Sequence, residues 1–276
     1  MSRFPRPAVM GVLNVTPDSF SDGGRFLAPE AATAHGRRLA GEGADLIDIG
    51  GESTRPGAEP VAPAEELRRV LPVIEALAEA TNVPLSIDTY KASVARAALA
   101  AGASFVNDVS ALRSDSEMPA VVAEAGVDVC LMHMKGEPRT MQEDPRYGDV
   151  VSEVKAFLEE RLAFAAGEGV REDRIWLDPG IGFGKTLEHN LELLRRLDEI
   201  VAIGQPVLVG LSRKRFLGAL TGRAEQERLA GGLSAVVMAF ERGATMFRVH
   251  DVRETRDALS VAGATLGEPR EIPEPR

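Results

Sequence analysis

Three polar side chains each close a short apolar segment and have the types needed to bind a ligand rich in hydrogen-bond donors. Asp88 ends the segment PLSID, Asn107 lies in FVNDV, and Asp178 ends RIWLD. A carboxylate removed from water must be hydrogen-bonded or paired, and two carboxylates repel each other. The set therefore favours a ligand with several N–H donors, such as a 2-amino-4-oxo-pyrimidine edge. A divalent metal held by all three, or strand-end residues that cap the following helices, are the alternatives.

The most specific string is NVTPDSFSDGG, which runs from Asn14 to Gly24. Asn14 offers a neutral oxygen to a hard cation such as Mg²⁺, or an amide donor to a phosphate oxygen. Asp18 and Asp22 are suited to meet a cation or a positive charge that develops during a reaction. A turn in which Asp and Ser side chains bond their own backbone is the alternative interpretation.

Two further segments carry cationic side chains. Arg55, within ESTRPG at 52–57, stays protonated and presents a planar fork that matches carboxylate or phosphate. The segment SRKR at 212–215 follows one apolar run, and Arg248 and His250 end the next, on the same side of an extended strand. These basic groups favour a phosphate site, and solvated surface arginines and lysines are the alternative.

The glycine-rich segment DPGIGFGK at 178–185 does not fit either common nucleotide-binding motif. A Walker A motif requires glycine where Pro179 stands, and GxGxxG requires glycine where Lys185 stands. The glycines are better suited to let the backbone approach a flat ligand, with Phe183 as a wall. No Ser-His-Asp set is indicated, and a lone Cys130–His133 pair does not make a zinc site.

These motifs follow eight apolar runs that recur along the chain and are separated by stretches with helical periodicity. The runs are AVMGVL, DLIDIGG, PLSIDT, FVNDV, VDVCLMH, RIWLDPG, PVLVGLS and MFRVHD. Helices are predicted at 29–42, 63–80, 91–101, 116–125, 147–168, 188–198, 225–242 and 252–265. This alternation predicts an α/β fold, a (β/α)₈ TIM barrel, in which groups at the carboxyl ends of the strands meet at one mouth.

We predict a single domain over 1–276 with a frayed tail at 267–276. Loops 15–28 and 52–62, the first and second βα loops, are long for such connections, and long loops at this face usually act as lids or substrate clamps.

The composition agrees with one barrel, since such barrels need about 250 residues and the chain has 276. The net charge of −10 argues against a nucleic-acid partner, because phosphate contacts need a basic face. No apolar run approaches the roughly 18 residues of a membrane span, and the N-terminal residues do not form a signal peptide. A single cysteine excludes an internal disulfide, so the cytoplasm is the expected compartment.

Taken in order, the motifs resemble those of dihydropteroate synthases over nearly the whole chain. The resemblance rests on NVTPDSFSDGG, ESTRPG, SIDT, NDV, HMKGEPRTMQ, DPGIGFGK, SRK and RVHDV. It implies a Mg²⁺-dependent homodimer that joins 6-hydroxymethyl-7,8-dihydropterin diphosphate to 4-aminobenzoate. The products are 7,8-dihydropteroate and diphosphate, in folate biosynthesis. Ile181 is the one departure within these motifs, at a position where an aromatic residue is also common.

The resemblance also implies a role for each motif residue. The pterin would be bound by Asp88, Asn107, Asp178 and Lys214. Asn14 would meet Mg²⁺ and diphosphate, and Arg248 and His250 would hold the diphosphate. The aminobenzoate site would be shaped by Thr54, Arg55, Pro56, Phe183 and Ser212.

A chemical mechanism follows from that resemblance. The leaving diphosphate is stabilised by Mg²⁺ and by the side chains of Lys214, Arg248 and His250. An electron-rich dihydropterin is able to delocalise a methylene cation, which Asp22 on the first loop is placed to stabilise. The arylamine is nucleophilic near neutral pH, so no general base is required. Asp22, Arg55 and Lys214 are therefore the expected catalytic residues.

Two other functions remain as alternatives. A pterin-binding methyltransferase that acts on methyltetrahydrofolate shares the same carboxylates but has no need of the diphosphate-binding residues. A catalytically silent pterin-binding paralogue is expected to lose Arg55 or the NVTPDSF loop, and both are present.

Overall fold

Eight parallel strands form the centre of the molecule. The computed structural model describes residues 4, 7–16, 24–54, 57–137 and 139–267. The strands are β1 (Ala8–Asn14), β2 (Leu46–Gly50), β3 (Leu85–Asp88), β4 (Phe105–Asp108), β5 (Asp128–Met132), β6 (Ile175–Asp178), β7 (Leu208–Gly210) and β8 (Met246–Val249). They pair in the order β6-β5-β4-β3-β2-β1-β8-β7, and a parallel bridge between Leu177 and Val207 joins the two outer strands. The predicted TIM barrel is confirmed.

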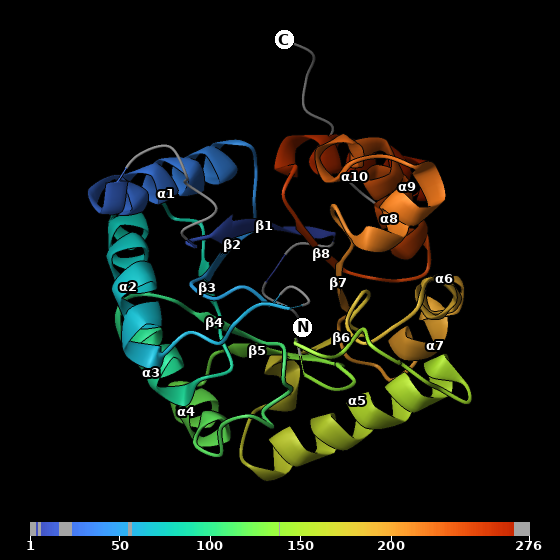
Figure 1. The fold of residues 1–276 in the computed structure, drawn as a ribbon, viewed down its shortest axis with the longest axis horizontal. Helices are drawn as coiled ribbons and strands as arrows, with labels where there is room; N and C mark the ends of the chain where they lie inside the picture. The colour runs from blue at the N-terminus through green and yellow to red at the C-terminus, as the bar shows by residue number, and fades with distance from the viewer. Residues whose placement is uncertain (1–3, 5–6, 17–23, 55–56, 138, 268–276) are drawn as a thin grey trace.

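Helices surround the strands as a ring (Figure 1). They are α1 (Gly24–Gly41), α2 (Pro63–Ala80), α3 (Ala92–Ala100), α4 (Met118–Ala125), α5 (Val150–Gly167), α6 (Leu187–Arg195), α7 (Leu197–Val201), α8 (Arg215–Thr221), α9 (Leu229–Glu241) and α10 (Val252–Leu266). Two 3₁₀ turns, η2 (Glu172–Arg174) and η3 (Glu225–Glu227), precede β6 and α9. In the described part of the chain, no helix is both long and apolar enough to cross a bilayer.

The observed helices differ from the predicted ones mainly at three places. Helix α1 begins at Gly24 instead of residue 29, because Pro29, which usually marks a first turn, is accommodated inside it. The helix predicted at 188–198 is interrupted at Arg196, whose φ of −113° and ψ of 32° are not helical. Helix α8 is too short to give a clear period in the sequence and was not predicted.

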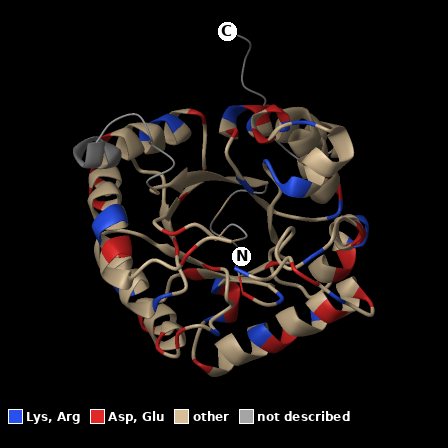
Figure 2. Ribbon diagram, viewed as in Figure 1, with Lys and Arg blue, Asp and Glu red and all other residues tan. Residues whose placement is uncertain are grey.

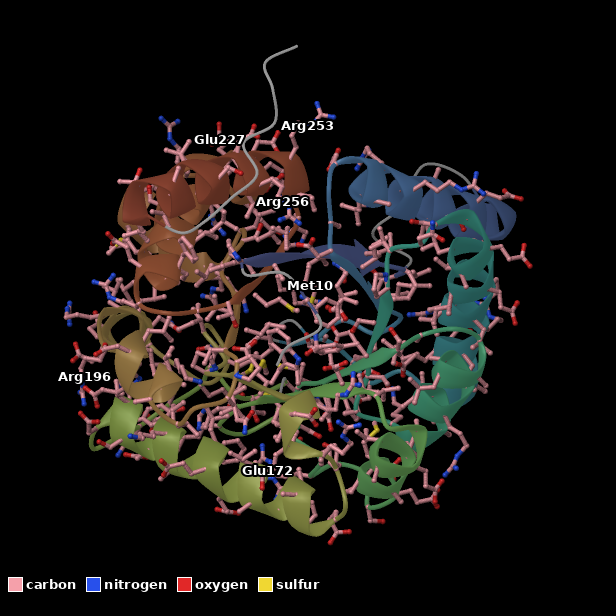
Figure 3. All side chains as sticks on the ribbon, turned by 180° about the vertical axis from the view of Figure 1, so that it is seen from behind. Met10, Glu172, Arg196, Glu227, Arg253 and Arg256 are labelled. Carbon is pink, nitrogen blue, oxygen red and sulfur yellow. The ribbon has the colours of Figure 1, made fainter. Side chains whose placement is uncertain are left out.

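Alternation along each strand separates two apolar layers. Residues such as Val9, Ile47 and Ile87 face outward and join one large cluster with the helices. Inward residues form a second cluster: Phe4, Ala8, Met10, Leu46, Phe105, Cys130, Trp176, Leu208 and Met246. The Phe4 ring packs edge-on against Trp176, with centroids 5.8 Å apart, and Figure 3 shows Met10 near the barrel axis from behind. The amino-terminal half of the barrel is therefore filled mainly by apolar side chains.

Candidate active site

The carboxyl ends of the strands bring the predicted polar residues into one ring. Asn14 on β1 is in register with Gly50, Gly50 with Asp88, and Asp88 with Asn107 on β4. A Cβ atom at Gly50 would lie 3.6 Å from Asp88 Oδ2 and 3.8 Å from Asn14 Oδ1, so the two oxygens flank this glycine. Asp178 ends β6 in the same inward orientation. Figure 2 shows charged residues at the barrel centre as well as on the outer helices.

Asp48, which the sequence analysis did not single out, connects these residues. Its side chain is fully buried inside β2. Its Oδ2 atom accepts hydrogen bonds from Arg248 Nε at 2.6 Å and from Asn107 Nδ2 at 3.0 Å, while Oδ1 accepts from Ser86 Oγ at 2.5 Å. Because the Asn107 amide nitrogen is engaged below, its carbonyl oxygen is left as an acceptor for a ligand.

Arg248 lies between two carboxylates. Besides its bond to Asp48, it donates from Nη2 to Asp88 Oδ2 at 2.7 Å. Burial opposes the charge of Arg248, but the two carboxylates more than compensate and raise its pKa above the usual value. Among the described residues, no acceptor bonds to Nη1, so this nitrogen remains for an anionic ligand.

Asp88 is the titratable group of this cluster that changes charge near neutrality. Burial raises the pKa of Asp88 to about 7, with Arg248 opposing and the Asp48 carboxylate assisting the shift. A buried acid with such a pKa is a common property of functional sites. Above that pH both oxygens of the carboxylate accept N–H donors, whereas below it one oxygen carries a proton and donates.

Asp178 begins the glycine-rich loop and is 6% exposed. Its Oδ1 atom accepts from the Gly180 amide at 2.7 Å, and no described residue donates to Oδ2. Burial raises the pKa of Asp178, which the Gly180 amide and Lys214 oppose. One oxygen thus fixes the loop and the other is available to a ligand.

Lys214 and Phe183 form a cation–aromatic pair beside that aspartate. The ammonium lies 4.2 Å from the ring centroid and donates to Ile181 O at 2.8 Å. Burial lowers the pKa of Lys214 to about 8, although Asp178 favours the charged form. The pair offers a flat apolar face next to a positive charge.

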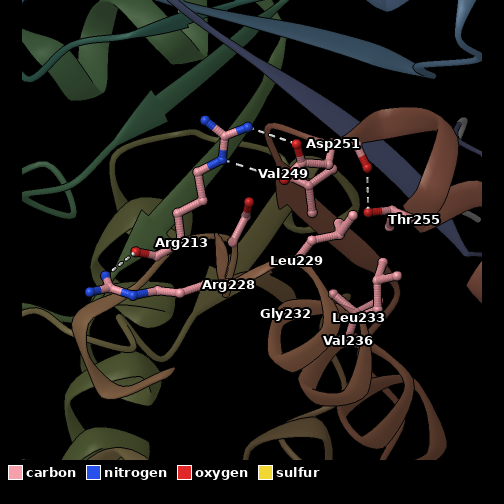
Figure 4. A pocket seen from close by; sticks show the side chains of 10 residues that line it. Arg213, Arg228, Leu229, Gly232, Leu233, Val236, Val249, Asp251 and Thr255 are labelled. Atoms are coloured by element: carbon pink, nitrogen blue, oxygen red, sulfur yellow. Dashed lines mark hydrogen bonds and ion pairs between the residues drawn. The ribbon is translucent and has the colours of Figure 1, made fainter. Parts of the chain in front are cut away.

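The segment after β7 is held in a strained conformation between two predicted site residues. Arg213 has a φ of 60°, which costs a non-glycine residue about 1–3 kcal/mol. It forms an ion pair with Asp251 at 2.7 Å, and Arg228 donates to its carbonyl oxygen at 3.0 Å (Figure 4). The hollow beneath them measures only about 10 Å³, too small for a substrate.

Ser212 and His250 meet on the other side of this segment. Ser212 Oγ lies 3.0 Å from His250 Nδ1 and accepts the His250 amide at 3.3 Å. The structure therefore brings both predicted residues to the loops after β7 and β8, where barrel enzymes often bind phosphate.

The β2–α2 loop starts from a buried charge cluster that the sequence analysis missed. Glu52 accepts a bond from Tyr90 at 2.7 Å and an ion pair from Lys91, which also contacts Glu66. Half-buried Thr54 follows two residues later. Beside it lies a cavity of about 410 Å³ whose lining includes Ser53 and Tyr90. Asp22, Arg55 and Pro56 lie outside the described residues, as does the tail beyond Gly267.

Comparisons with known proteins agree with this geometry. The profile of the family described as "Pterin binding enzyme" matches residues 10–250. Dihydropteroate synthase of Escherichia coli K12 is 48% identical over 260 residues, which cover 94% of this chain and 92% of that protein.

The chain belongs to the dihydropteroate synthase family.

Solved structures of family members share the fold closely. The Xanthomonas albilineans synthase with 4-aminobenzoic acid is 54% identical, with a TM-score of 0.91 and coverage of 96% of this chain and 94% of that chain. A structure of the synthase from the same organism in complex with 7,8-dihydropteroate is 51% identical, with a TM-score of 0.87 over 96% and 95%. These relatives cover nearly the whole chain.

Proposed function

We propose that this chain condenses 6-hydroxymethyl-7,8-dihydropterin diphosphate with 4-aminobenzoate, which forms 7,8-dihydropteroate and releases diphosphate in folate biosynthesis. The observation that carries the proposal is the buried set of acceptors at the mouth, contributed by Asp88, Asn107 and Asp178. The N–H edge of a pterin supplies the donors that this set requires. The similarity to synthases favours this reaction over methyl transfer and over a silent pterin-binding protein.

The reaction forms a bond between the arylamine nitrogen and the pterin methylene carbon while the C–O bond to diphosphate breaks. The two buried aspartates hold the pterin and place negative charge near a ring that becomes positive. Lys214 lies beside Asp178 with Phe183, and its positive charge would stabilise the developing anion. The free Nη1 atom of Arg248 and the His250–Ser212 pair are placed to bind diphosphate. The arylamine proton passes to water, since no strong base is needed.

We also propose Mg²⁺ as the cofactor. Asn14 Oδ1 and Asp88 Oδ2 flank Gly50, and such oxygens are the ligands that Mg²⁺ prefers. The described residues contain no group of three or more His, Cys, Asp or Glu suited to a metal, so diphosphate and water would complete the coordination. When bound, the ion would neutralise charge on the leaving diphosphate. Titration of Mg²⁺ with diphosphate should give weaker binding to Asn14→Ala than to the unaltered chain.

Our proposal further includes a homodimer in the cytoplasm. Helices α8 and α9 expose the apolar side chains of Leu220, Leu229 and Met238, which favours burial against a second copy. Cys130 is free and buried, in keeping with a reducing compartment. Sedimentation equilibrium should give twice the chain mass, and a monomer at assay concentrations would refute the dimer.

The activity is tested by following dihydropteroate formation from the two substrates with Mg²⁺. Product and diphosphate should appear in equal amounts, and omission of either substrate should abolish both. A chain that binds the pterin but forms no product would support the silent paralogue instead. Methyl transfer from methyltetrahydrofolate would support the other alternative.

A further inference from the structure

The loop between β6 and α6 has every carbonyl group from Gly180 to Gly184 bonded to a side chain. Lys185 Nζ donates to Gly180 O at 2.9 Å and to Phe183 O at 3.0 Å, and Lys214 Nζ donates to Ile181 O at 2.8 Å. Gln142 Nε2 donates to Gly182 O at 2.6 Å. Tyr147 Oη donates to Gly184 O at 2.8 Å. Loops rarely have all their carbonyls bonded by side chains, because water normally satisfies them. This loop follows Asp178, a predicted pterin contact, and carries Phe183, which is predicted as a wall for a flat ligand and which the resemblance places at the aminobenzoate site.

Lys185 supplies two of these bonds and has no access to a ligand. Its side chain is 3% exposed. Its third neighbour is His133 Nδ1, at 2.9 Å. Burial lowers the pKa of His133 to about 2, so the ring is neutral and its Nδ1 atom is able to accept a hydrogen bond from Lys185. With His133 O at 3.4 Å as a further neighbour, four acceptors surround Lys185 Nζ, which leaves none of its N–H donors for substrate.

The glycines of the loop show how tightly it is docked on the preceding βα connection. Gly180 has a φ of 66°, and a Cβ atom there would lie 1.8 Å from His133 O. Gly184 has a φ of 61°, and a Cβ atom there would lie 2.3 Å from Lys135 O. Only glycine permits both this backbone conformation and this approach.

Such a glycine-rich segment has a large conformational entropy when it is free, and fixing its backbone costs about 1–2 kcal/mol per residue. The side chains of Gln142 and Tyr147, from the β5–α5 connection, hold it through Gly182 O and Gly184 O. Asn190 on α6 adds a bond from the Gly182 amide at 2.6 Å. Apart from Lys214, the side chains that order the wall of the site are thus residues to which no ligand contact is assigned.

We propose that Lys185, with Gln142 and Tyr147, is a positioning residue that preforms the pterin-binding wall in the free enzyme. This inference rests on the proposed function, since it assigns a pterin to that wall. The three residues act through Phe183 and the loop backbone, so they determine pterin affinity and leave the chemical step unchanged once the pterin is bound.

The test measures binding of 6-hydroxymethyl-7,8-dihydropterin by calorimetry and steady-state kinetics with both substrates. Lys185→Met should raise the pterin Kd at least about tenfold, and Tyr147→Phe about threefold to tenfold, as expected for the loss of hydrogen bonds to loop carbonyls. At saturating pterin, kcat should stay within about twofold of the unaltered value. The thermal unfolding midpoint is recorded for each variant.

Arg256→Met is the matched control. Arg256 also pins a backbone carbonyl, since it donates to Gly43 O at 2.9 and 2.7 Å, but it does so between α1 and β2, at the opposite end of the barrel. Arg256 belongs to α10, and Figure 3 labels it in the view from behind. Its loss should lower the unfolding midpoint without changing the pterin Kd.

The outcomes separate the inference from the proposed function. Pterin binding by the unaltered chain is required by the proposed function, and its absence would overturn that function. If the unaltered chain binds and Lys185→Met binds equally well at a lower unfolding midpoint, the residue is only structural and the inference is wrong. Should Lys185→Met fail to fold, Tyr147→Phe decides, because it removes one hydroxyl, and an unchanged Kd would overturn the inference.

Discussion

Replacement of Asp178 by Asn tests the pterin-binding arrangement with the smallest possible change. The substitution keeps the size of the side chain. It also preserves an oxygen that accepts a hydrogen bond from the Gly180 amide, which lies 2.7 Å from Asp178 Oδ1 in the unaltered chain. The loop should therefore remain in place. The other oxygen, which no described residue donates to, becomes an NH₂ group that faces the donors of the ligand.

The expected loss follows from this reversal. A charge-assisted hydrogen bond is removed and two donors are set against each other in a buried place, which costs about 2–5 kcal/mol. That free energy corresponds to a pterin Kd raised about 30-fold to several thousand-fold. Since burial raises the pKa of Asp178 in the free enzyme, the replacement should not lower the free energy of unfolding.

Calorimetric titration with 6-hydroxymethyl-7,8-dihydropterin measures the change. Asp128→Asn is a suitable control, because Asp128 is a buried aspartate at the amino end of β5, bonded to Trp176 and Arg174. That control should lose stability and keep its pterin affinity. An unchanged Kd for Asp178→Asn, with an unchanged melting temperature, would refute the assignment of Asp178 to the pterin edge.

Three further predictions concern charge. The kcat/KM for the pterin substrate should be bell-shaped with pH: it should rise to pH about 7, as Asp88 becomes an acceptor, and fall above about 8, as Lys214 loses its proton. Lys214→Arg should remove the upper limb, and an upper limb kept at about 8 would contradict the assignment. His250→Ala should weaken binding of the diphosphorylated pterin far more than binding of the unphosphorylated alcohol. Calorimetry that shows equal losses of affinity for the two ligands would place His250 outside the diphosphate site. Asp48→Asn should lower the free energy of unfolding by about 3–5 kcal/mol in urea titrations, because it breaks a buried pair with Arg248, and a loss below about 1 kcal/mol would show that the pair is not stabilising.

The positions of the main acceptors could be predicted because strand periodicity decides them. Asp88, Asn107 and Asp178 each follow an apolar run, and in a parallel barrel all such positions lie at one mouth. The N-terminal cap of α6 also depends only on neighbouring residues. Thr186 stands directly before an apolar run, and its hydroxyl accepts a hydrogen bond from the His189 amide at 3.2 Å.

Asp48 and Lys185 could not be found in this way. In the sequence Asp48 is one acid inside a hydrophobic strand, and nothing local tells whether it caps a helix or bonds to a residue 200 positions away. In the sequence, Lys185 was noted only because it stands where the GxGxxG motif requires a glycine. Its role depends on His133, which lies in another βα unit.

The sequence by itself determined the barrel and the residues at its mouth, because both follow from short-range alternation of apolar and polar residues. Only the tertiary structure decided how those residues are paired. Arg248, predicted for diphosphate, has two of its nitrogens bonded to Asp48 and Asp88, and the glycine-rich loop is fixed by side chains from two other segments. Pairing of this kind depends on distances between atoms that are far apart along the chain, and closure of the barrel sets those distances.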